Sequence, residues 1–138
     1  MSFRTLLMLA ALAATAVPAC VVHTMEPGAV TADGSVYLGF NLYSSDGKTE
    51  RDAYPVGDQH GAFRSIRVVA DDDVVIGKVG VVFSNGERAV LSERMELRAG
   101  QSSHQMMLPG GPRAIHSVVM DARSKRKKLA NIEVYGAR

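Results

Sequence analysis

The sequence predicts an all-β protein, an antiparallel two-sheet β-sandwich or jelly roll of about eight short strands, preceded by an N-terminal signal helix. Short runs rich in Val, Ile, Leu, Phe and Tyr alternate with Gly, Pro, Asp and Asn at the spacing of antiparallel strands. No segment after the signal carries the stripe of an amphipathic helix. Without helices to cover a parallel sheet, the strands are expected to form two packed antiparallel layers.

The first element is an export signal over residues 1–19. Arg4 supplies a basic start, the run from Leu6 to Val17 is apolar, and small residues precede a cut. The run is about 13 residues long, whereas a permanent membrane span takes about 20. We therefore expect an exported protein without a membrane-spanning anchor.

Two cleavage sites fit this signal, one after Ala14-Thr15-Ala16 and one after Val17-Pro18-Ala19. The second makes Cys20 the first residue of the mature chain, and Val17-Pro18-Ala19-Cys20 resembles the lipobox of bacterial lipoproteins, although Pro18 departs from the usual pattern. Cys20 is therefore the candidate lipidation residue, and lipidation would be the only route to a membrane. The alternative is a soluble periplasmic protein in which Cys20 is an unmodified leader residue.

Residues 20–34 lack a hydrophobic period and contain Pro27, Gly28 and Asp33-Gly34, which predicts a flexible leader ahead of one domain over residues 35–138. The strand-forming runs are Val36–Ser44, Ala62–Ala70, Val74–Ser84, Arg88–Leu91, Met95–Arg98, His104–Leu108, Arg113–Asp121 and Leu129–Tyr135.

Two turns are predicted from their residues. Asn85-Gly86 favours a type I′ hairpin, because both residues tolerate a positive φ. The segment from Pro109 to Pro112 predicts a second turn, which would pair the strand ending at Leu108 with the strand beginning at Arg113.

Six segments occur in an order typical of one family: Leu38-Gly39, Gly61 to Arg67, Val82 to Glu87, Ala99 to Ser102, Leu108 to Arg113 and Ile132 to Gly136. Over roughly Val36 to Gly136 the chain resembles the exported bacterial family domain of unknown function 2541. The resemblance implies an exported β-rich fold without an established activity, and it gives no catalytic residue to transfer. Most of these residues are interpreted as fold determinants, with Phe63 and Ile66 in the core.

Composition limits the partners. The chain has 16 basic and 14 acidic side chains, and removal of Arg4 with the signal leaves 15 and 14, a formal charge near +1. One cysteine cannot form an intramolecular disulfide, so about 118 mature residues must be stabilised by one buried core. The absence of tryptophan argues against a broad aromatic platform for sugars.

The sharpest charge feature is a set of five basic residues, named the basic turn below: Arg123, Lys125, Arg126, Lys127 and Lys128. A cationic turn between the last two strands is a candidate site for anionic lipid or glycan, and a solvated hairpin has the same sequence pattern. Nucleic acid is not expected, because no aromatic residues alternate with the basic ones. The loops Asp46–Gly61 and Asp71–Asp73 are further candidates for a contact surface.

Two groups of side chains contain potential metal ligands. Asp71, Asp72 and Asp73, with Asp52 and Asp58 nearby, offer oxygen ligands for calcium, but the alternating spacing of a calcium loop is missing. His104 and His116, with Met106 and Met120, offer copper ligands on two strands expected to be neighbours. Pairing Met106 with Ile115 places the two histidines on opposite faces, so we expect no metal and no cofactor.

No catalytic residue is predicted. The six serines from Ser65 to Ser117 lie outside any nucleophile elbow, and pairs such as Glu93 and Glu96 have no distinguishing context. The sequence therefore favours a non-catalytic binding or structural module, whose partner is anionic lipid, glycan or another envelope protein. Two alternatives are a hydrolase of cell-wall polymer and a subunit of an envelope assembly, the latter predicting an exposed apolar patch or an unpaired sheet edge.

Overall fold

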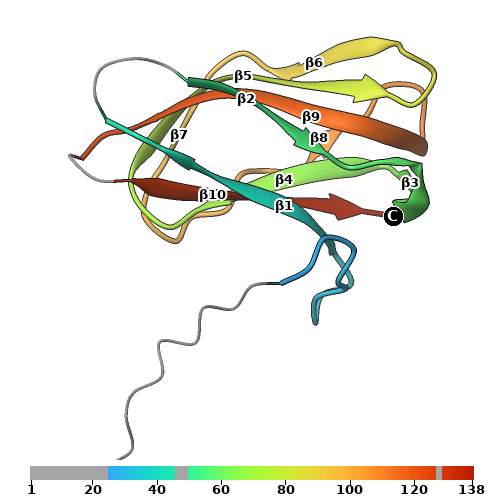
Figure 1. Ribbon diagram of the computed structural model, residues 1–138, viewed down its shortest axis with the longest axis horizontal. Helices are drawn as coiled ribbons and strands as arrows, with labels where there is room; N and C mark the ends of the chain where they lie inside the picture. The colour runs from blue at the N-terminus through green and yellow to red at the C-terminus, as the bar shows by residue number, and fades with distance from the viewer. Residues whose placement is uncertain (1–24, 46–49, 127–128) are drawn as a thin grey trace, which may run out of the picture.

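The computed structural model describes residues 25–45, 50–126 and 129–138, which form two antiparallel sheets packed face to face (Figure 1). The predicted all-β fold is confirmed. The export signal, both cleavage sites and Cys20 lie outside the described residues. In the described part the elements are β1 (Val36–Tyr43), β2 (Glu50–Pro55), a 3-10 turn η1 (Asp58–His60), β3 (Ala62–Phe63), β4 (Ser65–Ala70), β5 (Val74–Phe83), β6 (Arg88–Ser92), β7 (Met95–Leu97), β8 (Met106–Met107), β9 (Arg113–Ser124) and β10 (Ala130–Ala137).

The first sheet has the strand order β1-β10-β4-β8, and the second has the order β2-β9-β5-β6. The short strands β7 and β3 pair with β5 and β9, respectively, and extend the second sheet. The long strands β5 and β9 are therefore central, whereas β1 and β2 are edge strands of different sheets. Figure 1 shows that β1 ends and β2 begins at the same end of the sandwich, and that the two strands diverge away from that end.

Alternating side chains of the two sheets build one core. Along β10, Ala130, Ile132 and Val134 are fully buried, while the residues between them are partly exposed. Phe63 and Ile66 are also fully buried, as predicted. The core is apolar, so hydrophobic burial is the main source of stability.

The prediction missed β2 and joined two strands that the structure separates. Residues 50–55 carry three charges and a proline, so they lack the apolar alternation that reveals a strand, and their sequence predicts part of the loop Asp46–Gly61. The predicted strand Ala62–Ala70 is divided at Arg64, because β3 pairs with β9 and β4 pairs with β10 in the other sheet.

The predicted hairpin at Asn85-Gly86 forms between β5 and β6, but its turn type was wrong. Gly86 has a φ of 88°, whereas no described residue other than glycine has a positive φ, which excludes type I′. Three residues separate Phe83 from Glu87, whose carbonyl accepts the Phe83 amide hydrogen bond at 2.8 Å. The Asn85 side chain instead accepts a hydrogen bond from the Glu87 amide at 3.0 Å, a local bond that favours this wider turn.

Met25 to Gly34, part of the expected leader, folds back onto the start of β1. The Gly28 amide donates to the Tyr37 carbonyl at 2.7 Å, and the Tyr37 amide donates to the Ala29 carbonyl at 2.8 Å. An isolated antiparallel bridge joins Val30 to Val36. In the described ranges there is no helix of the length and apolar character needed to cross a membrane.

Candidate binding surface

The basic turn lies against Asp71, Asp72 and Asp73, named the acidic triplet below, although the sequence predicted the two as separate candidates. Lys125 Nζ is 3.1 Å from Glu96 Oε2, and Arg126 lies 3.5 Å from carboxylate oxygens of both Asp72 and Asp73. The hydrogen bond from Lys125 holds the pKa of Glu96 below its ordinary value. Two cations of the basic turn therefore have acidic partners within the domain, and Lys127 and Lys128 lie outside the described residues.

The acidic triplet organises the backbone around it. Asp71 Oδ1 accepts the Asn131 amide hydrogen bond at 2.7 Å, and Asp73 Oδ1 accepts the Ala99 amide hydrogen bond at 2.9 Å. Each bond ties the connection between β4 and β5 to another segment. Within the described part of the chain, no group of three or more His, Cys, Asp or Glu side chains is placed to hold a metal ion.

The structure corrects the strand pairing used for the histidines. Met106 in β8 pairs with Ile66 in β4, and Ile115 in β9 pairs with Phe83 in β5, so β8 and β9 belong to different sheets. The turn at Pro109 to Pro112 therefore connects the two layers. His104 and His116 are exposed, while Met106 and Met120 are core residues.

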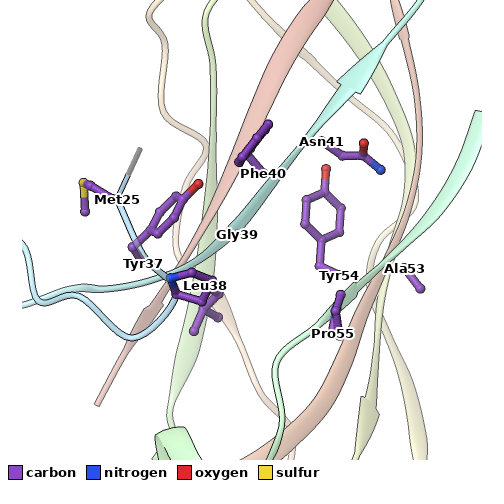
Figure 2. Close-up of a pocket in the computed structure, with 10 residues that line it drawn as sticks. Met25, Tyr37, Leu38, Gly39, Phe40, Asn41, Ala53, Tyr54 and Pro55 are labelled. Atoms are coloured by element: carbon purple, nitrogen blue, oxygen red, sulfur yellow. The ribbon is translucent and has the colours of Figure 1, made fainter. Parts of the chain in front are cut away.

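A hollow of about 240 Å³ lies between the edge strands β1 and β2 (Figure 2). Figure 2 shows the Tyr54 ring extending from β2 into the space beside β1, with Asn41 beyond its hydroxyl group. Phe40 lies on the opposite side of the β1 ribbon. The hollow is lined by Met25, Pro27, Tyr37, Leu38, Gly39, Phe40, Asn41, Ala53, Tyr54 and Pro55. The lining is mainly apolar and contains no carboxylate, imidazole, ammonium or guanidinium group.

Two tyrosines form the polar end of this region. Tyr43 and Tyr54 are almost fully buried, and their hydroxyl oxygens are 2.8 Å apart. The Tyr54 hydroxyl also donates to the Ile132 carbonyl at 3.5 Å. The pKa of Tyr54 is far above its ordinary value. Burial is the largest cause, and the nearby Tyr43 is the next. Tyr54 is therefore a neutral hydrogen-bonding group rather than an acid-base catalyst near neutral pH.

The mouth of the hollow exposes apolar side chains of β1. Phe40 is 53% exposed and Leu42 is 44% exposed, so both are large hydrophobic side chains in contact with solvent. Both project from the outer face of the first sheet, because Gly39, Asn41 and Tyr43 alternate with them. An exposed apolar pair at a sheet edge was the feature predicted for a subunit of an assembly.

The strand register shows which backbone groups of β1 face this edge. In an antiparallel pair of strands, two directly opposite residues either exchange both backbone hydrogen bonds or point their amide and carbonyl groups away from each other. Asn131 of β10 lies opposite Asp71 and accepts its amide hydrogen bond, so the backbone of Asn131 faces β4. The next residue, Ile132, faces β1, where its partner is Asn41. The backbone groups of Asn41 therefore bond to β10, and those of its two neighbours point to the free edge.

Other segments occupy the two ends of this free edge. At the start of β1, the amide and carbonyl of Tyr37 bond to Ala29 and Gly28 of the leader. Just past the end of β1, the Ser44 carbonyl accepts a hydrogen bond from the Ser124 amide at 2.9 Å. These bonds confirm that alternate residues of β1 face away from β10.

Between the two ends, none of the described residues pairs with the edge from Phe40 to Leu42, and we name this edge the β1 window. The Leu42 amide donates to its neighbour's side chain, Asn41 Oδ1, at 2.9 Å. Across the described ranges, no backbone hydrogen bond outside the ladder reaches Phe40 or the Leu42 carbonyl. The window thus presents one amide and two carbonyls beside two exposed apolar side chains.

The sequence pattern did not reveal this site, because the second wall of the hollow is the missed strand β2. The alternation of Phe40 and Leu42 with Gly39 and Asn41 was the available signal. It shows two apolar residues on the face opposite the core, but without β2 the edge position of β1 is not apparent.

Comparison with known proteins gives one match. A protein-family model described as "Domain of unknown function (DUF2541)" matches residues 6–136. No curated protein and no solved structure matches the chain.

Proposed function

The chain belongs to the DUF2541 family, and from this premise we propose that it is a non-catalytic binding module exported to the bacterial envelope, where it contacts another envelope protein. The observation that carries the proposal is the β1 window beside the apolar hollow. An apolar edge of this kind is suited to a polypeptide partner, because it offers both backbone hydrogen bonds and side-chain contacts.

The chemistry of the hollow supports a binding role over a hydrolytic one. A hydrolase of cell-wall polymer requires carboxylates or other titratable groups that face the substrate. The ionisable side chains in the lining are Tyr37 and Tyr54, and burial raises the pKa of both. Neither side chain is suited to general acid-base catalysis near neutral pH.

The basic turn remains the competing contact surface, for anionic lipid or glycan. Its internal ion pairs with Glu96, Asp72 and Asp73 reduce the charge available to such a ligand. This pairing favours the β1 window as the site of contact. A variant with all five basic residues replaced by glutamine tests the alternative: it is expected to bind vesicles of anionic lipid as weakly as the natural chain does.

A photocrosslinking experiment tests the proposed site in cells. A benzoylphenylalanine side chain replaces Phe40 in the full chain, and in a matched control it replaces Val90, an exposed apolar residue on β6 of the other sheet. We expect a protein adduct from position 40 and none from position 90. Equal adducts at both positions, or none at position 40, would contradict the proposal.

A separate experiment tests the cellular location of the protein. The apolar segment before Ala19 supports export, and Cys20 supports a lipid tether if cleavage occurs directly before it. We expect the mature chain in the envelope fraction, with an acylated mass that Cys20→Ala abolishes. An unmodified mass in the periplasmic fraction would support a diffusible module, and a full-length cytoplasmic chain would contradict export.

A further inference from the structure

We propose that the β1 window accepts an extended segment of a partner protein as an added antiparallel strand, and that three successive apolar residues of this segment occupy the window and the hollow. This inference rests on the proposed function and specifies the partner's chemistry. The adding strand is recognised through its backbone, with side-chain selection by the surface around it.

The backbone geometry favours a short antiparallel addition. A residue placed opposite Phe40 in an antiparallel strand can donate to its carbonyl and accept from its amide. A residue placed opposite Leu42 can donate to that carbonyl and replace Asn41 Oδ1 as the acceptor of the Leu42 amide. The leader bonds at Tyr37 and the Ser124 bond at Ser44 limit the addition to the residues between them.

The side chains define three apolar positions. Residues opposite Phe40 and Leu42 place their side chains on the outer face, in contact with these two exposed groups. The intervening residue points to the inner side of the sheet, toward the hollow. Known pockets for small molecules have volumes of roughly 300–1,000 Å³, so a hollow of about 240 Å³ better fits one side chain of a larger ligand.

The neighbouring edge strand, β2, is not suited to strand addition. The Val56 amide donates to the His116 carbonyl opposite it, so alternate residues of β2, including Pro55, face the free edge. Pro55 has no amide hydrogen to donate, and proline at a sheet edge blocks strand addition. The hollow therefore has one wall that can pair with a strand, β1, and one wall that contributes side chains.

The test uses a blocked peptide, acetyl-Lys-Thr-Val-Leu-Val-Thr-Lys-amide, with isotope-labelled protein carrying the complete mature sequence. In the proposed register the two valines face the window and the leucine enters the hollow. We expect the amide resonances of Phe40 and Leu42 to shift on titration. Methylation of either valine nitrogen is expected to weaken binding by at least about tenfold, because it removes a hydrogen bond to β1.

Methylation of the leucine nitrogen is the matched control, since that nitrogen points away from β1. It is expected to change the affinity by less than about twofold. The modifications are on the peptide, so folding of the protein does not affect the comparison. Failure of the peptide to bind, or equal effects at valine and leucine, would overturn strand addition.

These outcomes are distinct from failure of the proposed function. A photocrosslinked protein partner at position 40, together with equal methylation effects, would retain the binding module and reject the added strand. A crosslink only to a second copy, with a dimer in sedimentation, would reject a foreign partner and thus this inference. Loss of both the crosslink and peptide binding would overturn the two proposals together.

Discussion

At the scale of single residues, Gly136 is required by the packing of the core. It lies on β10 opposite Ile66, and a Cβ atom added there would lie 2.6 Å from Phe63 Cδ1. Phe63 is fully buried, so its ring has little space into which it can move. The small residue at position 136 is therefore part of the site that holds the Phe63 ring.

Gly136→Ala is expected to lower the free energy of unfolding by about 1 to 3 kcal/mol, because it overpacks a filled core. Urea unfolding measures the change. Gly77→Ala is the control, since a Cβ atom added there would have Asp121 Cβ as its nearest neighbour, at 3.4 Å, and the change should be smaller. In a Phe63→Leu background the penalty of Gly136→Ala should decrease, and an unchanged penalty would contradict the proposed contact.

The buried Tyr54 hydroxyl makes stability depend on alkaline pH. Burial raises the pKa of Tyr54 in the folded protein above its ordinary value of 10.0, at which it ionises in the unfolded chain. The stability that the neutral Tyr54 hydroxyl contributes is complete below about pH 10. It is lost as the pH rises, because the unfolded state then releases a proton that the folded state retains.

Tyr54→Phe removes this contribution and should flatten the alkaline loss of stability. Between about pH 9 and about pH 11, the natural chain is expected to lose about 1.4 kcal/mol more unfolding free energy than the variant. Urea unfolding at both pH values provides the measurement. The pKa of Tyr135 is also raised, so part of the alkaline loss should persist in the variant. Identical losses in both chains would contradict the assignment to Tyr54.

At the scale of elements, β1 has two kinds of amide. The register assigns the Asn41 amide to the ladder with β10 and the Phe40 amide to the free edge. Proline distinguishes the two kinds, because it removes the amide hydrogen of the residue that it replaces.

Phe40→Pro is expected to retain the fold, whereas Asn41→Pro should cost about 2 kcal/mol more, since it leaves the Ile132 carbonyl without its ladder donor. Thermal and urea unfolding measure the difference. Phe40→Ser and Asn41→Ser are the controls, because they remove the same side chains and keep the amides. If the two proline variants lose equal unfolding free energy relative to their serine controls, the assignment of the Asn41 amide to the ladder and the Phe40 amide to the free edge is wrong.

The connection between β4 and β5 is an element that charge and hydrogen bonding hold together. Asp73 accepts the Ala99 amide hydrogen bond, and its own carbonyl accepts the Lys125 amide hydrogen bond at 2.9 Å. Asp73→Ala removes the side-chain bond and should lower the unfolding free energy by about 1 kcal/mol in urea. Glu93→Ala, at an exposed position between β6 and β7, should change it by less than about 0.5 kcal/mol. Equal effects would contradict an organising role for Asp73.

At the scale of the whole molecule, residue patterns predicted the layers better than the connections. Apolar alternation identified the central strands β5 and β9, because a buried strand must present apolar side chains to the core. Strand pairing depends on distant segments, so the sequence around Met106 did not reveal that β8 joins β4 instead of β9. The charged strand β2 was missed for a related reason, since an edge strand buries few side chains.

The same distinction applies to the candidate site. The basic turn was conspicuous in sequence because its charges are consecutive, yet its acidic partners come from the β4–β5 connection and from Glu96 of β7. The β1 window depends on which backbone groups remain unbonded, a property that follows from the register and not from residue type. Sequence therefore identified a charged segment, and the structure was needed to find the open edge.

The position of β10 has a consequence for synthesis. This last strand lies between β1 and β4, so the first sheet has no central strand until residues 130–137 are available. A ribosome releases these residues after all the other described strands, so β1 must wait for a partner that is distant in sequence. The first sheet is therefore completed only after the other described strands have been synthesised, and a nascent chain arrested before Ala130 should remain open to proteolysis. A delay of this kind is compatible with transport of the chain before it folds.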